Sequence, residues 1–396
     1  MGRTKAIVLG AGIGGLTTAA ALRRAGIGVE IFEAAPQQRK TGTGLGLASN
    51  ATAVLDALGI EFGSIAQTMR KFELRTAAGE LMREIPIAAI TAELGTPIIT
   101  IHRNELIDAM HAAAGDTPIH YDARATGYAV RADGGVEVRF ADGRSTVGDL
   151  LIGADGIRSV VRARLQGERP PTEYGYLCWL AIIPFRHARI TEGYAGHYWG
   201  PGQRFGLIDI GGGRAYWWGT KNMPATQARD WRGGKDDILA AFAGWAPEVR
   251  QAIRETDEAA IVAVPAQDRP FSTHWGTGPV TLVGDAAHPM LTSLSQGAGS
   301  AIEDGYVLAR SLAVRLASGG DVAAGLRDYE KARIPRTRAL VAGSRRLSMT
   351  EQLADPVACA ARNLLLKYVP TTVLQRVNME PMRFTVEPMP APEQVN

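Results

Sequence analysis

Glycines at positions 10, 12 and 15 are the first residues whose spacing indicates chemistry. They follow the apolar run AIVLG and precede a segment of helical spacing, and Glu33 closes the next apolar run. In such a strand–turn–helix unit, these glycines allow a tight turn, the approach of a pyrophosphate and close helix–strand packing. An acid at Glu33 would bind ribose hydroxyls and repel a 2′-phosphate, so the pattern predicts FAD or NAD rather than NADP. The alternative is that the glycines serve packing alone.

Two aspartates stand at the ends of other apolar runs. Asp155-Gly156 ends LLIGADG, and Asp285 follows VTLVG. Ligands of doubly wound sheets bind at the carboxyl edge, although Asp-Gly is also a common surface turn. We expect Asp285 to accept hydrogen bonds from ribityl or ribose hydroxyls. His288 has no second metal ligand at suitable spacing, which favours a structural hydrogen bond.

A third glycine-rich stretch opens a long helical pattern. Gly297, Ala298 and Gly299 precede SAIEDGYVLARSLAVRL. The N–H groups and the dipole at the start of that helix would stabilise negative charge on a reduced flavin. The distance along the chain between this stretch and the first glycines favours a long ligand, FAD.

The composition excludes several classes of protein. The 396 residues are 46% hydrophobic and 21% charged, with a net charge of +3 and scattered basic residues. This argues against nucleic-acid binding and against an anionic membrane surface. The two cysteines, Cys178 and Cys359, exclude a disulfide scaffold, and no metal site is expected. Without a signal sequence or a membrane span, the expected location is cytoplasmic.

The elements that must position these residues form an α/β pattern. A strand–helix–strand unit opens the chain, a helix is predicted over 103–115, and a β-meander over 127–156. From about 171 to 279, tryptophan and tyrosine become dense in short runs of strand character, and long helices follow from 299 to about 368. The predicted organisation is an FAD-binding domain (1–70, 101–170 and 280–345), a β-rich substrate domain (71–100 and 171–279), a C-terminal helical segment (346–385) and a flexible tail (386–396).

The ordered set of motifs resembles a known family. GAGIGG with its distant Glu33, IHRNEL, GADGIRSVVR and GDAAHPM…QGAGSAIED together resemble the single-component FAD-dependent aromatic hydroxylases, the p-hydroxybenzoate hydroxylase-like flavoprotein monooxygenases. The stretches YGYLCWLAIIPF and GQRFGLIDIGGGRAYWW look most like the urate hydroxylase and zeaxanthin epoxidase branch. The resemblance implies a glutathione-reductase-like Rossmann FAD domain, an inserted β-sheet substrate domain and no separate NAD(P)H domain.

The resemblance also implies roles for residues at matching positions. Gly10, Gly12, Gly15, Glu33 and Arg103 would hold the adenosine and pyrophosphate of FAD. Asp285 would hold the ribityl and pyrophosphate groups, Gly297 to Gly299 would face the isoalloxazine, and Asp155-Gly156 would serve FAD and the transient nicotinamide.

For the substrate, the resemblance assigns catalytic positions to Arg204 and Tyr216. Arg204 would position or polarise an anionic or carbonyl-bearing substrate, and Tyr216 would donate a hydrogen bond. Because side chains alternate along a strand, Tyr216 and Trp218 are expected to line the cavity, with Trp217 facing away. Ordinary strand packing is the alternative for each.

The chain departs from the family next to the expected flavin. Thr292 replaces a usual proline, and Ser293 replaces an acid of the urate-hydroxylating relatives, which argues against urate. Leu180 replaces a frequent arginine. The pocket is therefore expected to be less charged, and its substrate more apolar, such as a natural-product intermediate.

The sequence thus predicts an FAD-dependent monooxygenase that consumes NADH or NADPH. By resemblance, O₂ adds at flavin C4a, and the hydroperoxide transfers one oxygen atom to an aromatic or heteroaromatic small molecule. The alternatives are an epoxidase, a drug-inactivating hydroxylase, and a non-catalytic FAD-binding protein that sequesters a ligand. A monomer or homodimer is expected.

Overall fold

The computed structural model describes residues 4–38 and 43–391. Its first domain is built on a five-stranded parallel sheet in the order β18-β12-β1-β2-β8. The strand bounds are β1 (Lys5–Leu9), β2 (Gly28–Phe32), β8 (Ile119–His120), β12 (Leu150–Gly153) and β18 (Val280–Leu282). Strands β12 and β18 are buried along their whole length, because elements cover both faces of this sheet. The predicted Rossmann-like sheet is confirmed.

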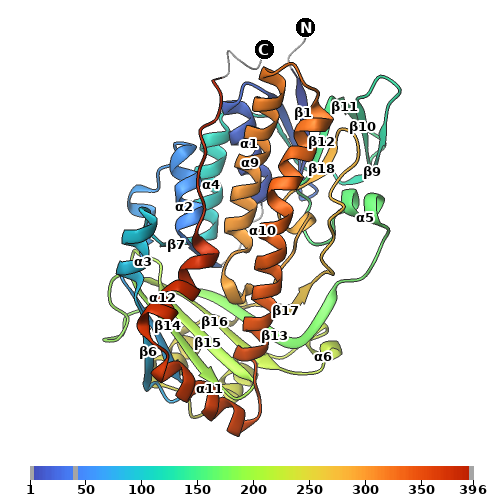
Figure 1. Cartoon of the computed structure of the whole chain (residues 1–396). Coiled ribbons are helices and arrows are strands. Elements are labelled where there is room, and N and C mark those ends of the chain that lie inside the picture. The colour runs from blue at the N-terminus through green and yellow to red at the C-terminus, as the bar shows by residue number, and fades with distance from the viewer. Residues whose placement is uncertain (1–3, 39–42, 392–396) are drawn as a thin grey trace.

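Helices pack on one face of this sheet and meet each other closely (Figure 1). They are α1 (Ile13–Arg24), α2 (Ser49–Ala57), α4 (Arg103–Ala114), α9 (Gly297–Ala317) and α10 (Val322–Glu351). A Cβ added at Gly305 of α9 would lie 2.7 Å from the backbone N of Thr18 in α1. Only glycine therefore allows α9 to lie directly against α1, which brings the N-termini of these two helices to the same region.

Two small sheets complete this domain. One is an antiparallel meander in the order β11-β10-β9, with strands β9 (Ala125–Val130), β10 (Val136–Phe140) and β11 (Ser145–Gly148). The meander predicted over 127–156 therefore ends earlier, at Gly148, because β12 pairs with β1 and β18 in the parallel sheet. Helix α5 (Val160–Gln166) follows β12. The second small sheet has the order β3-β7-β4, with strands β3 (Gly44–Leu47), β4 (Ala66–Thr68) and β7 (Ile99–His102).

A seven-stranded sheet in the order β17-β13-β16-β15-β14-β5-β6 forms the second domain. Its strands are β5 (Lys71–Thr76), β6 (Leu81–Ile85), β13 (Thr172–Pro184), β14 (Tyr194–Gly200), β15 (Gln203–Asp209), β16 (Arg214–Asn222) and β17 (Val262–Asp268). Helix α3 (Ile87–Leu94) follows β6, and α6 (Ala225–Arg229), α7 (Lys235–Ala241) and α8 (Pro247–Glu255) lie between β16 and β17 in the chain.

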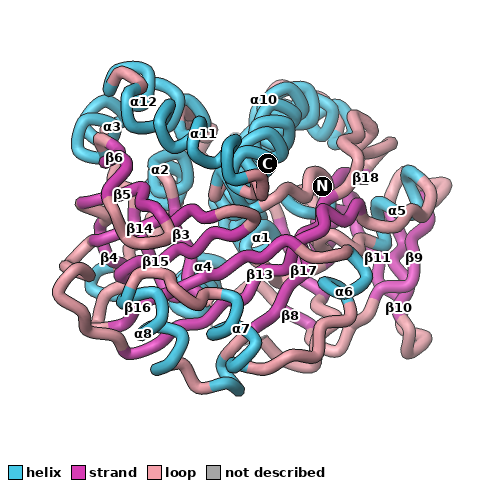
Figure 2. The backbone as a smooth tube through the Cα atoms, turned by 90° about the horizontal axis from the view of Figure 1, so that it is seen from below, coloured by secondary structure: helices cyan, strands magenta, loops and turns pink. Residues whose placement is uncertain are grey.

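Alternating side chains divide this sheet into two faces. Trp179, Phe205 and Trp217 point to an outer core that they share with Ile238 of α7 and Val249 of α8. Figure 2 shows α7 and α8 on one side of the strands and α10, α11 and α12 on the other. The alternate side chains of β13, β15 and β16 therefore point to the inner face of the sheet, which is turned toward the first domain.

The C-terminal helices link the two domains. α10 continues to Glu351, so the predicted boundary at 345/346 falls inside a single helix. Helices α11 (Pro356–Tyr368) and α12 (Thr371–Met379) follow, and α12 packs near α3 and β6. Within residues 4–38 and 43–391, no helix combines the length and apolarity needed to cross a membrane.

The first part of the predicted tail lies against α9. Tyr306 Oη donates to the carbonyl oxygen of Glu387 at 2.8 Å, and Arg310 Nε donates to that of Pro388 at 3.1 Å. Residues 392–396 of the predicted flexible tail lie outside the described residues.

Candidate active site

The turn between β1 and α1 is shaped by three glycines with different surroundings. Gly10 has φ +105°, and a Cβ there would lie 2.4 Å from the carbonyl oxygen of Ala154. A Cβ at Gly15 would lie 1.9 Å from the carbonyl oxygen of Gly10. A Cβ at Gly12, in contrast, would meet no atom within 4 Å. Gly10 and Gly15 are thus required by the fold, whereas Gly12 borders open space in which a ligand can approach the backbone.

Glu33 follows β2 and stands over the same turn. Its Oε2 accepts from the backbone N–H of Ala11 at 2.9 Å, and its Oε1 accepts from that of Ala35 at 2.8 Å. These two bonds hold the carboxylate beside the open space at Gly12. Gly12 is the N-cap of α1 and supplies no side-chain cap, so the first N–H groups of this helix can donate to a phosphate.

The predicted aspartates meet at the carboxyl ends of β12 and β18. Asp155 Oδ2 accepts from the backbone N–H of Val160 at 2.7 Å and so helps to cap α5. Arg162 of α5 donates through Nη1 to the carbonyl oxygens of Asp285 at 3.2 Å and Ala286 at 2.9 Å. This arginine joins the two turns. Gly156, with φ +77°, borders open space.

The Asp285 side chain is accessible to solvent, yet many protein atoms lie around it. This combination is typical of a side chain that lines a cleft. This enclosure raises the pKa of its carboxyl, and electrostatic interactions with His288, Arg103 and Arg162 oppose the rise. Arg103, the first residue of α4, is thus close enough to Asp285 to act on it electrostatically. Two residues predicted to hold neighbouring parts of FAD therefore lie near each other.

A buried ionic network fixes the start of α9. His288 Nε2 lies 2.5 Å from Asp304 Oδ2, and the backbone N–H of Gly284 donates to the same oxygen at 2.9 Å. Arg333 of α10 donates through Nε to Asp304 Oδ1 at 2.7 Å and through Nη1 to Glu303 at 2.5 Å. The structural role predicted for His288 is confirmed. The network fixes the turn that carries Asp285 relative to α9.

The helix N-terminus above this network is uncapped by any side chain. Gly297 and Ala298 are half-buried, and Gly299 packs against Asn50, where a Cβ would lie 3.0 Å from Nδ2. Asn50 in turn donates to Gln296 at 2.9 Å and to Glu303 at 2.5 Å. Asn50 is not among the residues predicted from the sequence, because no local pattern distinguishes it.

Tyr216 and Trp218 lie on the inner face of the seven-stranded sheet, and Trp217 lies on the outer face, where its Nε1 donates to Thr256 at 2.8 Å. A Cβ at Gly44 of β3 would lie 2.6 Å from the Tyr216 side chain. The Tyr216 ring therefore sits on the backbone of the first domain. The rings of Tyr216 and Trp218 are 5.6 Å apart.

Arg204 reaches from β15 to two segments of the other domain. Its Nη2 donates to Thr292 Oγ1 at 3.3 Å, and its Nη1 lies 2.5 Å from Glu351 Oε2 at the end of α10. Ser293 lies beside the same carboxylate. Glu351 is not among the residues predicted from the sequence, and the loss of an acid at Ser293 predicted fewer charges here. An acid is present, but another helix supplies it.

The groups around this ion pair are held neutral. Burial, helped by the charge of Arg204, lowers the pKa of His197 to about 3. Burial raises the pKa of Cys178 to about 12, with Arg204 opposing. Burial likewise raises the pKa of Tyr216, so its hydroxyl keeps its proton at neutral pH. His197 and Cys178 were also missed by the sequence analysis.

The protonation of the pair follows from its geometry. Burial lowers the pKa of Arg204, but the Glu351 carboxylate outweighs that effect and the net direction is upward. Burial raises the pKa of Glu351, and Arg204 opposes it. At 2.5 Å the two groups form an ion pair whose charges cancel. The inner face therefore offers hydrogen bonds without net charge.

The cleft fits an extended dinucleotide. Gly12, Glu33 and Asp285 follow strands of the parallel sheet at its carboxyl edge, and the N-termini of α1 and α9 have no side-chain cap. Uncapped N–H groups suit phosphates and a charged ring edge, and carboxylates suit hydroxyl groups. Within the described ranges, no group of three or more His, Cys, Asp or Glu side chains is placed to hold a metal ion.

This fold and site are those of an FAD-dependent monooxygenase. Residues 3–344 match the family described as FAD binding domain, and the chain belongs to that family. The match confirms the predicted family, the fold class and FAD as the cofactor. The chain is an enzyme of this class, which sets aside the alternative of a non-catalytic binding protein.

The similar proteins include hydroxylases and related enzymes. The aurachin C monooxygenase/isomerase of Stigmatella aurantiaca is 36% identical over 381 residues, which cover 96% of this chain and 98% of the relative. An FAD-dependent urate hydroxylase of Klebsiella pneumoniae is 34% identical over 86% of this chain and 89% of the relative. The crystal structure of HpxO from Klebsiella pneumoniae, complexed with FAD and uric acid, has a TM-score of 0.88 at 29% identity and covers 96% of both chains.

Proposed function

We propose that this enzyme inserts one oxygen atom from O₂ into a neutral aromatic or heteroaromatic small molecule, with NADH or NADPH as reductant. The proposal rests on the side chains that the inner face of the substrate sheet presents. There Tyr216 and Trp218 lie on the same face as Arg204, which donates to Thr292 just before the start of α9. A planar ring between this face and the cofactor would lie against aromatic and apolar side chains.

FAD would be held by the residues of the cleft. The N–H groups at Gly12 and the start of α1 would bind the pyrophosphate, and Glu33 and Arg103 the adenosine part. Asp285 would accept from ribityl hydroxyls, Gly297, Ala298 and Gly299 would face the ring system, and Asp155-Gly156 would border the cofactor and the nicotinamide. When bound, FAD supplies the reduction by NAD(P)H and the activation of O₂.

The substrate is neutral because the pocket has no unpaired charge. Arg204 is compensated by Glu351, and His197, Cys178 and Tyr216 are uncharged at neutral pH. Burying an anion beside a compensated arginine would leave one negative charge without a partner, at a large cost in free energy. This favours phenols, N-heterocycles and similar natural-product rings over carboxylates and over urate.

Two donors would orient the substrate. Tyr216 Oη keeps its proton and makes no hydrogen bond to another residue in the described part of the chain, so it can donate to a substrate oxygen. Arg204 Nε is buried and also lacks a partner among the described residues. Hydrogen bonds from these groups would increase negative charge on the substrate oxygen and activate the ring for attack. Trp218 would exclude water from the ring.

The test is to measure substrate-dependent oxidation of NADH and NADPH by the purified yellow holoenzyme. The panel contains neutral phenols and N-heterocycles, alkenes, and matched aromatic carboxylates. Acceleration by neutral rings, with a hydroxylated product by mass spectrometry, is expected; alkene oxide formation would identify an epoxidase. Acceleration by the carboxylates alone would contradict the neutral-substrate proposal. The proposal places the enzyme in the cytoplasm as a monomer or homodimer, which fractionation and light scattering would check.

A further inference from the structure

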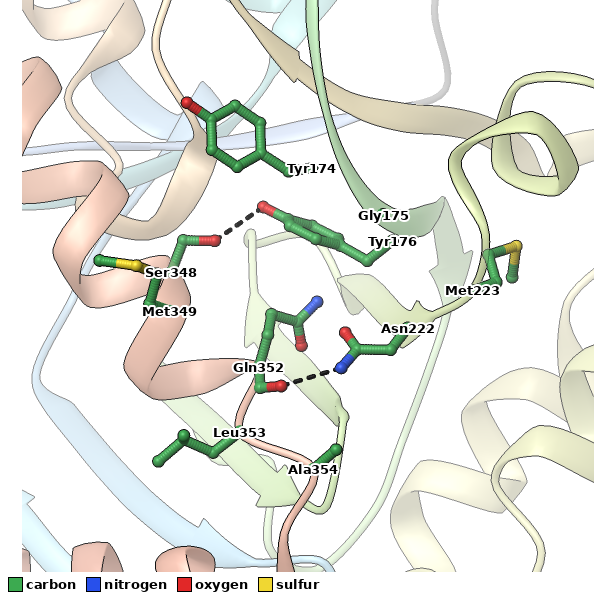
Figure 3. Close-up of a pocket in the computed structure, with 10 residues that line it drawn as sticks. All are labelled: Tyr174, Gly175, Tyr176, Asn222, Met223, Ser348, Met349, Gln352, Leu353 and Ala354. Carbon is green, nitrogen blue, oxygen red and sulfur yellow. Dashed lines mark hydrogen bonds between the residues drawn. The ribbon is translucent and has the colours of Figure 1, made fainter.

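A cleft of about 610 Å³ lies outside the site described above (Figure 3). It is bounded by the start of β13, the end of β16 and the last turns of α10 with the segment that follows. Its ten lining residues are Tyr174, Gly175, Tyr176, Asn222, Met223, Ser348, Met349, Gln352, Leu353 and Ala354. Its volume is that of sites which hold small organic ligands.

The lining of this cleft is uncharged. None of its ten residues is Asp, Glu, Lys, Arg or His, in a chain in which 21% of residues are charged. Burial raises the pKa of Tyr176, and burial together with Asp268 raises that of Tyr174 to about 12, so both phenols remain neutral. Met223, Met349 and Leu353 supply flexible apolar surface. The nearby Arg345 is paired with Asp268, and no lining residue is a cation that could bind a phosphate, so the cleft suits a neutral, apolar group.

The Gln352 amide lies at the centre of the cleft, between Tyr176 and Asn222 (Figure 3). Its Oε1 accepts from Thr220 Oγ1 at 3.2 Å. Its Nε2 is buried and has no hydrogen-bond partner among residues 4–38 and 43–391. A buried amide donor without a partner is unfavourable. The face of a substrate ring at the border of the cleft, or an oxygen on that ring, would supply that partner once the amide turns toward it.

The cleft shares a wall with the inner face of the substrate sheet. Thr220 Oγ1, which donates to Gln352, also accepts from the backbone N–H of Arg204 at 3.3 Å. Gln352 directly follows Glu351, the partner of Arg204. Beside it, the hydroxyls of Tyr176 and Ser348 are 3.1 Å apart. The hydrogen bond between Thr220 and Gln352 therefore lies between the cleft and Arg204, and rotation of the Gln352 amide breaks this bond.

We propose that this cleft binds the apolar substituent of the substrate while the ring lies beside Tyr216 and Trp218. This inference rests on the proposed function and extends it: the substrate is a neutral aromatic molecule with a long apolar chain. The chain passes the wall where Thr220 and Gln352 meet, and the Gln352 amide turns toward the substrate. Affinity then increases with chain length until the cleft is filled.

The experiment measures binding to the oxidised holoenzyme without reductant. 4-Alkylphenols with chains from methyl to nonyl are titrated, and dissociation constants are read from the perturbation of the flavin absorbance. Each methylene that enters the cleft should tighten binding roughly fourfold. Met349→Glu places a charge at the rim of the cleft, where the side chain is 63% exposed, and Leu365→Glu places the same charge at a side chain of α11 that is 70% exposed and not in the lining.

The expected result is a strong preference for long chains in the wild type and in Leu365→Glu, and a weak preference in Met349→Glu. Gln352→Leu, which removes the hydrogen bond to Thr220, should keep the preference for long chains. An equal preference in the wild type and Met349→Glu, or no gain with chain length in the wild type, would overturn the proposal. These titrations need no turnover, so their result tests only the proposed binding of the apolar chain. A failure of the NAD(P)H oxidation assay would instead count against the proposed reaction.

Discussion

Arg204 and Glu351 lie 147 positions apart in the chain, yet Nη1 and Oε2 are 2.5 Å apart in the interior. Arg204 belongs to the central part of the substrate sheet, and Glu351 ends the helix that also braces the FAD domain through Arg333. Arg204 further contacts Thr292. This pair therefore connects the substrate sheet, α10 and the segment before α9, and it decides the charge that a substrate meets.

Glu351→Gln should reverse the charge preference of the pocket. The substitution leaves Arg204 buried and uncompensated, which should lower the free energy of unfolding by about 3–5 kcal/mol. It should also favour anionic rings over neutral ones. The measurements are urea unfolding and the ratio of dissociation constants for 4-hydroxybenzoate and 4-methylphenol. In the double variant with Arg204→Gln, both the loss of stability and the preference for anionic rings should largely disappear. If Glu351→Gln alone keeps the wild-type preference between anionic and neutral rings, the role of this pair is contradicted.

Gly12 and Gly15 should respond differently to a side chain. Gly15→Ala collides with the carbonyl oxygen of Gly10 and should destabilise the fold by roughly 1–3 kcal/mol or more. Gly12 has extended backbone and open space, so Gly12→Val should fold normally. Its side chain would occupy the space of the pyrophosphate, and FAD affinity should fall roughly 10- to 100-fold for each lost charged hydrogen bond. Circular dichroism and flavin titration separate the two; normal FAD binding by Gly12→Val would contradict the placement of the pyrophosphate.

Asp285→Ala should release flavin without changing substrate preference. The carboxylate stands in the cleft beside the charges of Arg103 and Arg162, where it would accept from the ribityl chain. Losing one charged hydrogen bond should weaken FAD binding roughly 10- to 100-fold. Equilibrium dialysis against FAD measures this effect. Asp230→Ala, at a side chain that is 65% exposed, is the matched control, and full FAD occupancy in Asp285→Ala would refute the assignment.

His197 should make the enzyme less stable as the pH falls. Its pKa is about 3 in the folded protein, against an ordinary value near 6.5, because it is buried near Arg204. Between these values the unfolded chain binds the additional proton, so the stability present above about pH 6.5 is lost on acidification, by up to about 1.4 kcal/mol per pH unit. His197→Phe should lose less stability between pH 7 and 4.5 in urea unfolding. His274→Gln, at an exposed histidine, should retain the wild-type dependence; equal slopes in all three proteins would disprove the idea.

The residues that could be predicted from the sequence are those whose role depends on local geometry. Gly10 and Gly15 are constrained by a turn that a few neighbouring residues define, and Glu33 by the end of the following strand. The opposite faces of Trp217 and Trp218 follow from the two-residue period of a strand. The ordered motifs likewise predicted the family: GAGIGG, GADGIRSVVR and GDAAHPM each lie at the end of a strand of the parallel sheet, and IHRNEL lies at the end of β7 of a smaller sheet.

Only the tertiary structure decided the charge of the substrate pocket. At Ser293 the sequence lacks the acid that the urate-hydroxylating relatives carry. Nothing in the sequence around Glu351 indicates that Glu351 supplies a carboxylate at the same site. The two come together because α10 packs along α9 and ends against the inner face of the substrate sheet. The same packing forms the uncharged cleft at Gln352. Contacts between residues so far apart depend on how helices and sheets pack, and local sequence patterns do not contain that information.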